Sequence, residues 1–159
     1  MTDTLQTASL RVQDFLAQHG EFKVQRLSDS ARTAAEAAQA LGCTIAQIAK
    51  SLIFKDESTG DAVLIIASGS NMVHMGKFYT VTGIKLAKAD AAFVREKIGY
   101  AIGGVPPVAH ASQVHTFLDQ DLQQYTEIWA AAGTPHSVFQ LTPQQLAQLT
   151  QAAWIDVAK

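Results

Sequence analysis

The segment that most constrains the fold of this chain is Gly99–His110, which reads GYAIGGVPPVAH and contains three glycines, two prolines and no charged residue. Glycine permits positive φ and close approach of another molecule, whereas proline fixes φ and keeps the preceding residue extended. We therefore expect a rigid loop with exposed N–H groups on Gly103, Gly104 and Val105, which can bind an anion or oxyanion. The alternative is a tight turn between core strands, because Gly-Pro clusters are common in turns.

Composition indicates one globular domain over residues 1–159, with 48% hydrophobic and 16% charged residues and a net charge of −2. Apolar runs such as Ala62–Ala67 are too short to cross a membrane, and no secretion signal is evident. Cys43 is the only cysteine, so an internal disulfide is excluded and a cytoplasmic location is expected. Mild acidity argues against sequence-independent coating of nucleic acid. Lys50–Lys97 nevertheless holds seven Lys/Arg against five Asp/Glu, which fits a local basic face or an ordinary solvated surface.

Helical spacing, caps and β-rich runs predict mixed secondary structure without a strict βαβ rhythm. Asp29 or Ser30 and Asp90 are expected to cap two of the helices, and Thr142-Pro143-Gln144-Gln145 is the clearest helix start. The predicted helices are Thr4–His19, Ala31–Leu41, a short helix after Thr44, Met75–Thr82, Ala91–Ile98 and Pro143–Leu149. The predicted strands are Lys23–Leu27, Ser51–Lys55, Ala62–Ala67, Gln113–Leu118, Ile128–Ala132 and His136–Leu141. This pattern indicates a compact α/β or α+β domain.

Several familiar catalytic patterns are missing from the sequence. Gly69 and Gly76-Lys77 lie too far apart for a P-loop, and Phe78 stands where that motif needs Ser or Thr. There is no G-x-S-x-G nucleophile elbow. His110 and His115 do not have the i, i+4 spacing of a zinc helix, and no second cysteine assists them. We therefore expect neither a metal site nor another cofactor.

Lys50 is the candidate functional cation. It lies in Gln47–Phe54, where a helical turn gives way to an apolar strand. A lysine flanked by core residues must extend to solvent or point into a polar cavity, and its compact charge can bind a phosphate. The alternative is a lysine that keeps an edge strand soluble.

Taken in order, these motifs resemble the YbaK/EbsC family of aminoacyl-tRNA deacylases, whose fold also occurs as the editing insertion of bacterial prolyl-tRNA synthetases. The similarity runs from about Arg11 to Val157. The motifs that carry it are Ile48–Phe54 around Lys50, Gly103-Gly104-Val105-Pro106-Pro107, Arg32–Ala38, Ala67–Asn71 and Ala131–His136. The chain departs from the family pattern at Met72 and His74, where Arg and Asp are commoner, and at Ala109, where glycine is usual.

The resemblance implies a mixed, partly barrel-like sheet flanked by helices, and hydrolysis of the ester that joins a wrong amino acid to tRNA. The resemblance assigns catalytic roles to Lys50, Gly103 and Gly104, and the mechanism that it implies uses no metal. The implied substrate-binding residues are Val105, Pro106, Pro107, Ser70, Asn71 and His136. The implied partner is the acceptor end of an aminoacyl-tRNA, and a cognate aminoacyl-tRNA synthetase is a further candidate.

An aminoacyl ester is already activated, so a positioned water and oxyanion donors can suffice for its hydrolysis. In this family the 2′-hydroxyl of the tRNA is thought to help place that water. We expect a free-standing trans-editing deacylase for tRNA-Pro carrying a small wrong amino acid. The alternative is a non-catalytic module that uses the same pocket for an aminoacyl group, a nucleotide or a protein partner.

Overall fold

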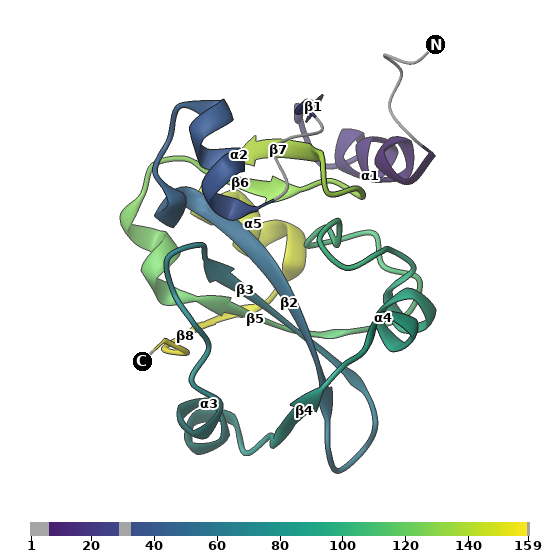
Figure 1. The fold of residues 1–159 in the computed structure, drawn as a ribbon, viewed down its shortest axis with the longest axis vertical. Helices are drawn as coiled ribbons and strands as arrows, with labels where there is room; N and C mark the ends of the chain where they lie inside the picture. The colour runs from purple at the N-terminus through teal and green to yellow at the C-terminus, as the bar shows by residue number, and fades with distance from the viewer. Residues whose placement is uncertain (1–6, 29–32, 159) are drawn as a thin grey trace.

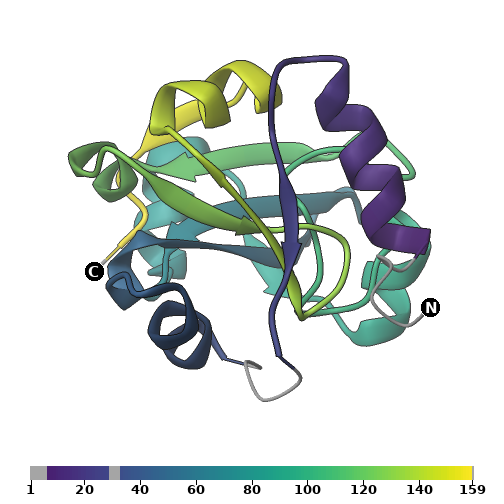
Figure 2. The same cartoon turned by 90° about the horizontal axis from the view of Figure 1, so that it is seen from above.

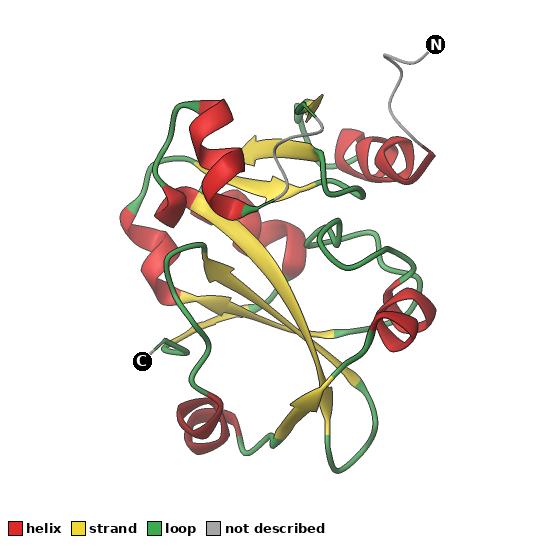
Figure 3. Ribbon diagram, in the orientation of Figure 1, coloured by secondary structure: helices red, strands yellow, loops and turns green. Residues whose placement is uncertain are grey.

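The computed structural model describes residues 7–28 and 33–158, which form an eight-stranded mixed sheet with helices around it (Figures 1, 2 and 3). The strands lie in the order β1-β7-β6-β2-β3-β5-β8, and β4 pairs with the end of β2. They are β1 (Val24–Arg26), β2 (Ile48–Asp56), β3 (Ala62–Ser68), β4 (Leu86–Lys88), β5 (His115–Asp119), β6 (Ile128–Ala131), β7 (Ser137–Leu141) and β8 (Ala153–Ile155). The predicted mixed sheet flanked by helices is confirmed.

The long strand β2 joins the two halves of the sheet. Its first residues pair in parallel with β6, and most of its length pairs antiparallel with β3. Figure 1 shows β2 running from the β6–β7 group past β3 and β5 to β4 at its far end, so the sheet is strongly curled. Among the described residues no pairing joins β1 to β8, so hydrogen bonds do not close the curled sheet into a barrel.

The structure describes five α-helices, and a side-chain cap is seen at the start of all but the first. They are α1 (Thr7–Ala17), α2 (Ala34–Leu41), α3 (Met75–Thr82), α4 (Ala91–Ile98) and α5 (Pro143–Thr150), with short turns η1 (Ile45–Gln47) and η2 (Gln120–Gln124). The predicted caps Asp90 and Thr142 are present, the latter as a capping box with Gln145. Thr33 caps α2, while the predicted caps Asp29 and Ser30 lie outside the described residues. None of the described helices is long and apolar enough to cross a membrane.

The central strand β3 is buried along its whole length and serves two hydrophobic clusters. Leu64 and Ile66 belong to the larger cluster, which also takes residues from α1, α4 and α5. Val63 and Ile65 alternate with them and pack in the smaller cluster with Phe78 of α3. Because side chains alternate across a strand, both faces of β3 are covered by core side chains. The neighbouring strand β2 is only half-buried from Lys50 onward and forms part of the surface.

The structure differs from the sequence prediction mainly in its short elements. The strands β4 and β8 and the turn η2 were not predicted. The segments LAK of β4 and AWI of β8 lack the alternation of charged and apolar residues that indicated the equally short β1. The strand β2 begins at Ile48, three residues before the predicted start at Ser51. The first helix ends at Ala17 rather than His19, and its predicted start at Thr4 lies outside the described residues.

Candidate functional site

The Gly99–His110 loop is built on a tight turn that needs glycine. The N–H of Gly104 donates to the carbonyl of Ala101 at 3.0 Å, and Gly103 occupies the third position of that turn with φ of +92°. Positive φ at this position is the signature of a type II turn. The Tyr100 hydroxyl closes the loop by donating to the carbonyl of Ala109 at 2.9 Å. The loop is therefore a fixed structure with a defined surface.

The two central glycines of the loop, Gly103 and Gly104, lie in different surroundings. Gly104 packs against the turn at Gly133-Thr134: its carbonyl accepts from Gly133 N–H at 2.9 Å, and a Cβ at Gly104 would lie 2.7 Å from Thr134 Cα. A Cβ at Gly103 would meet only Pro135, at 3.6 Å. Because Gly104 N–H is used in the turn, it is not free for an oxyanion, which corrects that part of the catalytic expectation. The N–H groups of Gly103 and Val105 have no acceptor among the described residues.

The loop forms one end of a groove that also contains Lys50. This cavity has a volume of about 270 Å³ and lies between α2, the outer face of β2, β6 and β7, and the loop. Lys50, Gly103 and Val105 all line it. The fold thus brings together the cation and the two free amide donors that the sequence analysis singled out, although they come from distant parts of the chain.

A second cavity of about 260 Å³ adjoins the first. The residues that line both are Ser51, Leu52, Ile102, Gly103 and Val105. The second cavity extends toward Ile53, Phe54 and Val94 and is mainly apolar. Sequence analysis missed Ser51, whose hydroxyl oxygen is buried without a hydrogen-bond partner among the described residues. A buried hydroxyl without a partner is unusual in a folded protein, and this one belongs to a residue that lines both cavities.

Lys50 is held in the groove by few contacts. Its ammonium lies 3.4 Å from the carbonyl oxygen of Gly69. Burial lowers the pKa of Lys50, and the carboxylate of Asp119 partly offsets that effect. The ammonium is therefore partly desolvated and incompletely paired, as expected for a group that binds a phosphate or ribose oxygen.

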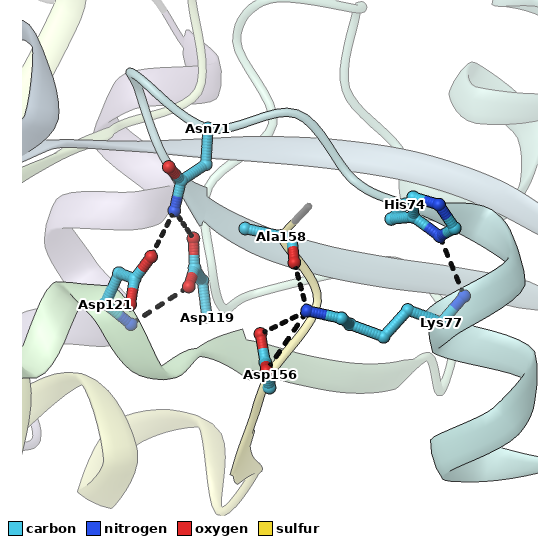
Figure 4. Close-up of polar contacts among 7 residues, drawn as sticks. All are labelled: Asn71, His74, Lys77, Asp119, Asp121, Asp156 and Ala158. Atoms are coloured by element: carbon cyan, nitrogen blue, oxygen red, sulfur yellow. Dashed lines mark hydrogen bonds and ion pairs between the residues drawn. The ribbon is translucent and has the colours of Figure 1, made fainter.

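Asn71 is part of a polar network with Asp119 and Asp121 (Figure 4). Its side-chain amide donates to the carboxylates of Asp119 and Asp121, each at 2.8 Å. The fully buried Asp119 also accepts from the backbone N–H of Ser68 at 3.0 Å. Asn71 thus holds the 68–71 loop, which carries the Gly69 carbonyl, and it lines neither cavity. The hydroxyl of Ser70 lies 3.3 Å from that of Ser68, also outside both linings.

The remaining predicted substrate-binding residues lie near the groove rather than in it. Pro106 and Pro107 are buried and line neither cavity, so they brace the loop from within, and Pro135 contributes to the groove wall instead. His136 follows Pro135, and its Nδ1 is buried with no partner among the described residues. The part of the chain that the structure describes contains no group of three or more His, Cys, Asp or Glu that could hold a metal ion.

Comparison with known proteins identifies the family. The model of the aminoacyl-tRNA editing domain matches residues 28–149. The chain belongs to this family. The resemblance to YbaK/EbsC proteins is thereby confirmed, and the family assigns the chain a tRNA-editing role with aminoacyl-tRNA as substrate.

Individual relatives cover nearly the whole chain. The uncharacterised protein YwhH of Bacillus subtilis is 34% identical over 141 residues, which are 87% of this chain and 88% of that protein. EbsC of Enterococcus faecalis, a candidate Cys-tRNA(Pro)/Cys-tRNA(Cys) deacylase, is 26% identical over 82% of this chain and 79% of its own. A solved candidate trans-editing enzyme for prolyl-tRNA synthetase is 44% identical with a TM-score of 0.92, covering 98% of this chain and 99% of the other.

Proposed function

We propose that this protein is a free-standing trans-editing deacylase that hydrolyses the ester of tRNA-Pro carrying a small wrong amino acid. The observation that carries the proposal is one groove that contains Lys50 together with the N–H groups of Gly103 and Val105, for which the described part of the chain offers no acceptor. Its natural location is the cytoplasm, where tRNA is charged and used. A cognate aminoacyl-tRNA synthetase is the proposed protein partner.

In the proposed reaction a water attacks the ester carbonyl carbon, and negative charge develops on the carbonyl oxygen. The N–H groups of Gly103 and Val105 donate to that oxygen, the form of stabilisation that is usually largest in acyl transfer. The bond from the carbonyl carbon to the ribose oxygen then breaks. One proton of the attacking water passes to the ribose oxygen, which regains its hydroxyl, and the other is released to solvent as the amino acid leaves as a carboxylate.

Lys50 binds the terminal phosphate or ribose and so fixes the ester against the loop, in the manner of a positioning group. The 2′-hydroxyl of the tRNA orients the attacking water. This division of work needs no Ser, Cys or His nucleophile. It is consistent with a groove in which Lys50 is the charged side chain among the described lining residues.

The second cavity is the proposed pocket for the amino-acid side chain. It begins at Gly103 and is lined mainly by apolar residues that include Ile53 and Val94, and Lys88 also belongs to its lining. Its size suits a small side chain, so alanine, cysteine, serine and 2-aminobutyrate are the candidates, and the name of EbsC adds weight to cysteine. A pocket of this kind separates substrates that differ by one methylene by only about 10–200-fold.

The test is single-turnover deacylation of tRNA-Pro charged with alanine, cysteine, serine or 2-aminobutyrate, with correctly charged prolyl-tRNA as the control. We expect hydrolysis of at least one mischarged form, undiminished by a metal chelator, and slow hydrolysis of the prolyl form. Binding of every substrate without hydrolysis would favour the non-catalytic module instead. Loss of all activity in chelator would exclude the metal-free mechanism.

A further inference from the structure

The end of the groove opposite the Gly103 loop carries an aromatic side chain to which no role has been given. Trp129 lies on β6, where its neighbours Ile128 and Ala130 are buried in the core at 0% and 1% exposure. Alternation therefore turns the Trp129 side chain to the other face of the sheet, where it is half-buried and lines the groove. This places an indole ring on the wall of a ligand cavity.

The wall contributed by α2 is made of small side chains. Ala34 and Ala37 stand three residues apart, on one face of the helix, and both line the groove with Trp129. The described residues at this end bring no charged group into the lining. An apolar slot between an indole ring and two alanines suits a flat, uncharged ring system better than a phosphate or an ammonium.

Strand register sets the order of groups along the groove. Trp129 pairs with Ile48 of β2, and Lys50 is two residues further along that strand, or about 7 Å away. Leu52 comes after another two residues and lines the groove together with Gly103. The order of residues along the groove is therefore Trp129, then Lys50, then Leu52 with Gly103. In the 3′-terminal aminoacyl-adenosine of a charged tRNA, the adenine base, the ribose with its phosphate and the ester follow in the same order.

We infer that Trp129 forms the subsite for the terminal adenine, which stacks on the indole ring beside Ala34 and Ala37. This inference rests on the proposed function for the identity of its ligand. Stacking of a base on an aromatic ring is tolerant of base identity, so the subsite accepts a purine by its flat face and contributes mainly to affinity. Trp129 is thus a binding residue, as Lys50 is, while the proposed oxyanion donors remain the N–H groups of Gly103 and Val105.

The first experiment needs no aminoacyl substrate. The indole N–H signals of Trp129 and Trp154 are followed by NMR during titration with 5′-AMP and, separately, with ribose 5-phosphate. We expect 5′-AMP to shift the Trp129 signal, ribose 5-phosphate to leave it nearly unchanged, and Trp154, which lies on β8 outside the groove, to respond to neither. An unmoved Trp129 signal at saturating 5′-AMP overturns the inference, whether or not the protein edits tRNA.

The second experiment measures coupling between the ring and the base. The probe is a short acceptor-stem RNA ending in CCA, with alanine joined to the 3′ position by a stable amide, and its twin lacks the terminal base. Trp129→Leu should weaken binding of the complete probe about ten-fold or more, Trp129→Phe should bind nearly normally, and Trp154→Leu should match the wild type. Thermal melts of all three variants confirm folding.

The base-less probe distinguishes a stacking role from a structural one. If Trp129 stacks on the base, removal of the base weakens wild-type binding but hardly affects Trp129→Leu. If removal of the base weakens binding equally in the wild type and in Trp129→Leu, the inference is wrong. Should the NMR shift and the coupling appear while no mischarged tRNA is hydrolysed, the purine subsite stands and the deacylase proposal fails.

Discussion

Gly103→Ala separates catalysis from backbone strain. Gly103 has φ of +92°, and its added Cβ would make only ordinary contact, at 3.6 Å from Pro135. The structural cost is therefore conformational, about 1–3 kcal/mol. For a chain of 159 residues this corresponds to a melting temperature lower by about 2–12 °C. The new methyl group also enters the junction of the two cavities, where the ester is proposed to lie.

The effect on rate should be much larger than the effect on stability. Displacing the ester from one oxyanion donor costs about 10²–10³-fold in rate. The matched control is Gly60→Ala in the β2–β3 turn, which has φ of +79° and nothing within 4 Å of the added Cβ. Both variants are assayed by thermal melting and by single-turnover deacylation of mischarged tRNA-Pro.

We expect similar losses of melting temperature in the two variants and a loss of rate only in Gly103→Ala. A folded Gly103→Ala protein that deacylates mischarged tRNA-Pro at the wild-type rate would refute the proposal that the loop takes part in catalysis. Gly104→Ala is no substitute for this control, because its Cβ would lie 2.7 Å from the backbone of Thr134. That variant should lose stability whatever the loop does.

Three further predictions follow from particular contacts. Ala109 has φ of +66°, so Ala109→Gly should raise stability by about 0.5–1 kcal/mol in a denaturant titration; an unchanged midpoint would argue against strain there. Asp119→Asn should cost about 1–3 kcal/mol by disturbing buried hydrogen bonds to Ser68 and Asn71 and should also slow deacylation; wild-type values in both assays would contradict the network. Burial lowers the pKa of His110 in the folded protein. The contribution of the neutral imidazole to folding stability is therefore complete above the unfolded pKa and is lost as the pH falls through the lower folded value. The melting temperature of the wild type should fall on acidification, and His110→Gln should make the melting temperature less dependent on pH.

Local features of the fold could be predicted because their causes are local. The caps Asp90 and Thr142 act within one helical turn, so the sequence alone indicates α4 and α5. The short strands β4 and β8 depend on pairing with distant partners, β2 and β5. The equally short β1 also pairs with a distant strand, but its alternation of charged and apolar residues was visible locally, and β4 and β8 show no such alternation.

The site was predictable to the extent that a residue type carries its own chemistry. Lys50 and Gly103 stood out as a cation among apolar residues and as a glycine in a rigid loop, and the structure lines one groove with both. Which side of the loop faces the groove was not predictable, so the burial of Pro106 and Pro107 emerged only from the fold. Ser51 and Trp129 join the groove through strand register, which a single sequence does not reveal.

The central claim is that Lys50 acts in an ester-hydrolysing groove and contributes little to folding. Its only hydrogen bond among the described residues is the long contact to Gly69, so Lys50→Ala should melt like the wild type. Lys50→Arg should restore activity only in part, because a planar guanidinium does not replace a compact ammonium. The control on the same strand is Lys55→Ala, because Lys55 lies over the ring of Phe93 and lines neither cavity.

The most direct measurement is single-turnover hydrolysis of mischarged tRNA-Pro by Lys50→Ala and Lys55→Ala, beside thermal melts of both proteins. We predict that Lys50→Ala loses nearly all activity with an unchanged melting temperature, while Lys55→Ala retains the wild-type rate. Wild-type turnover by Lys50→Ala, or unfolding of that variant, would contradict the account.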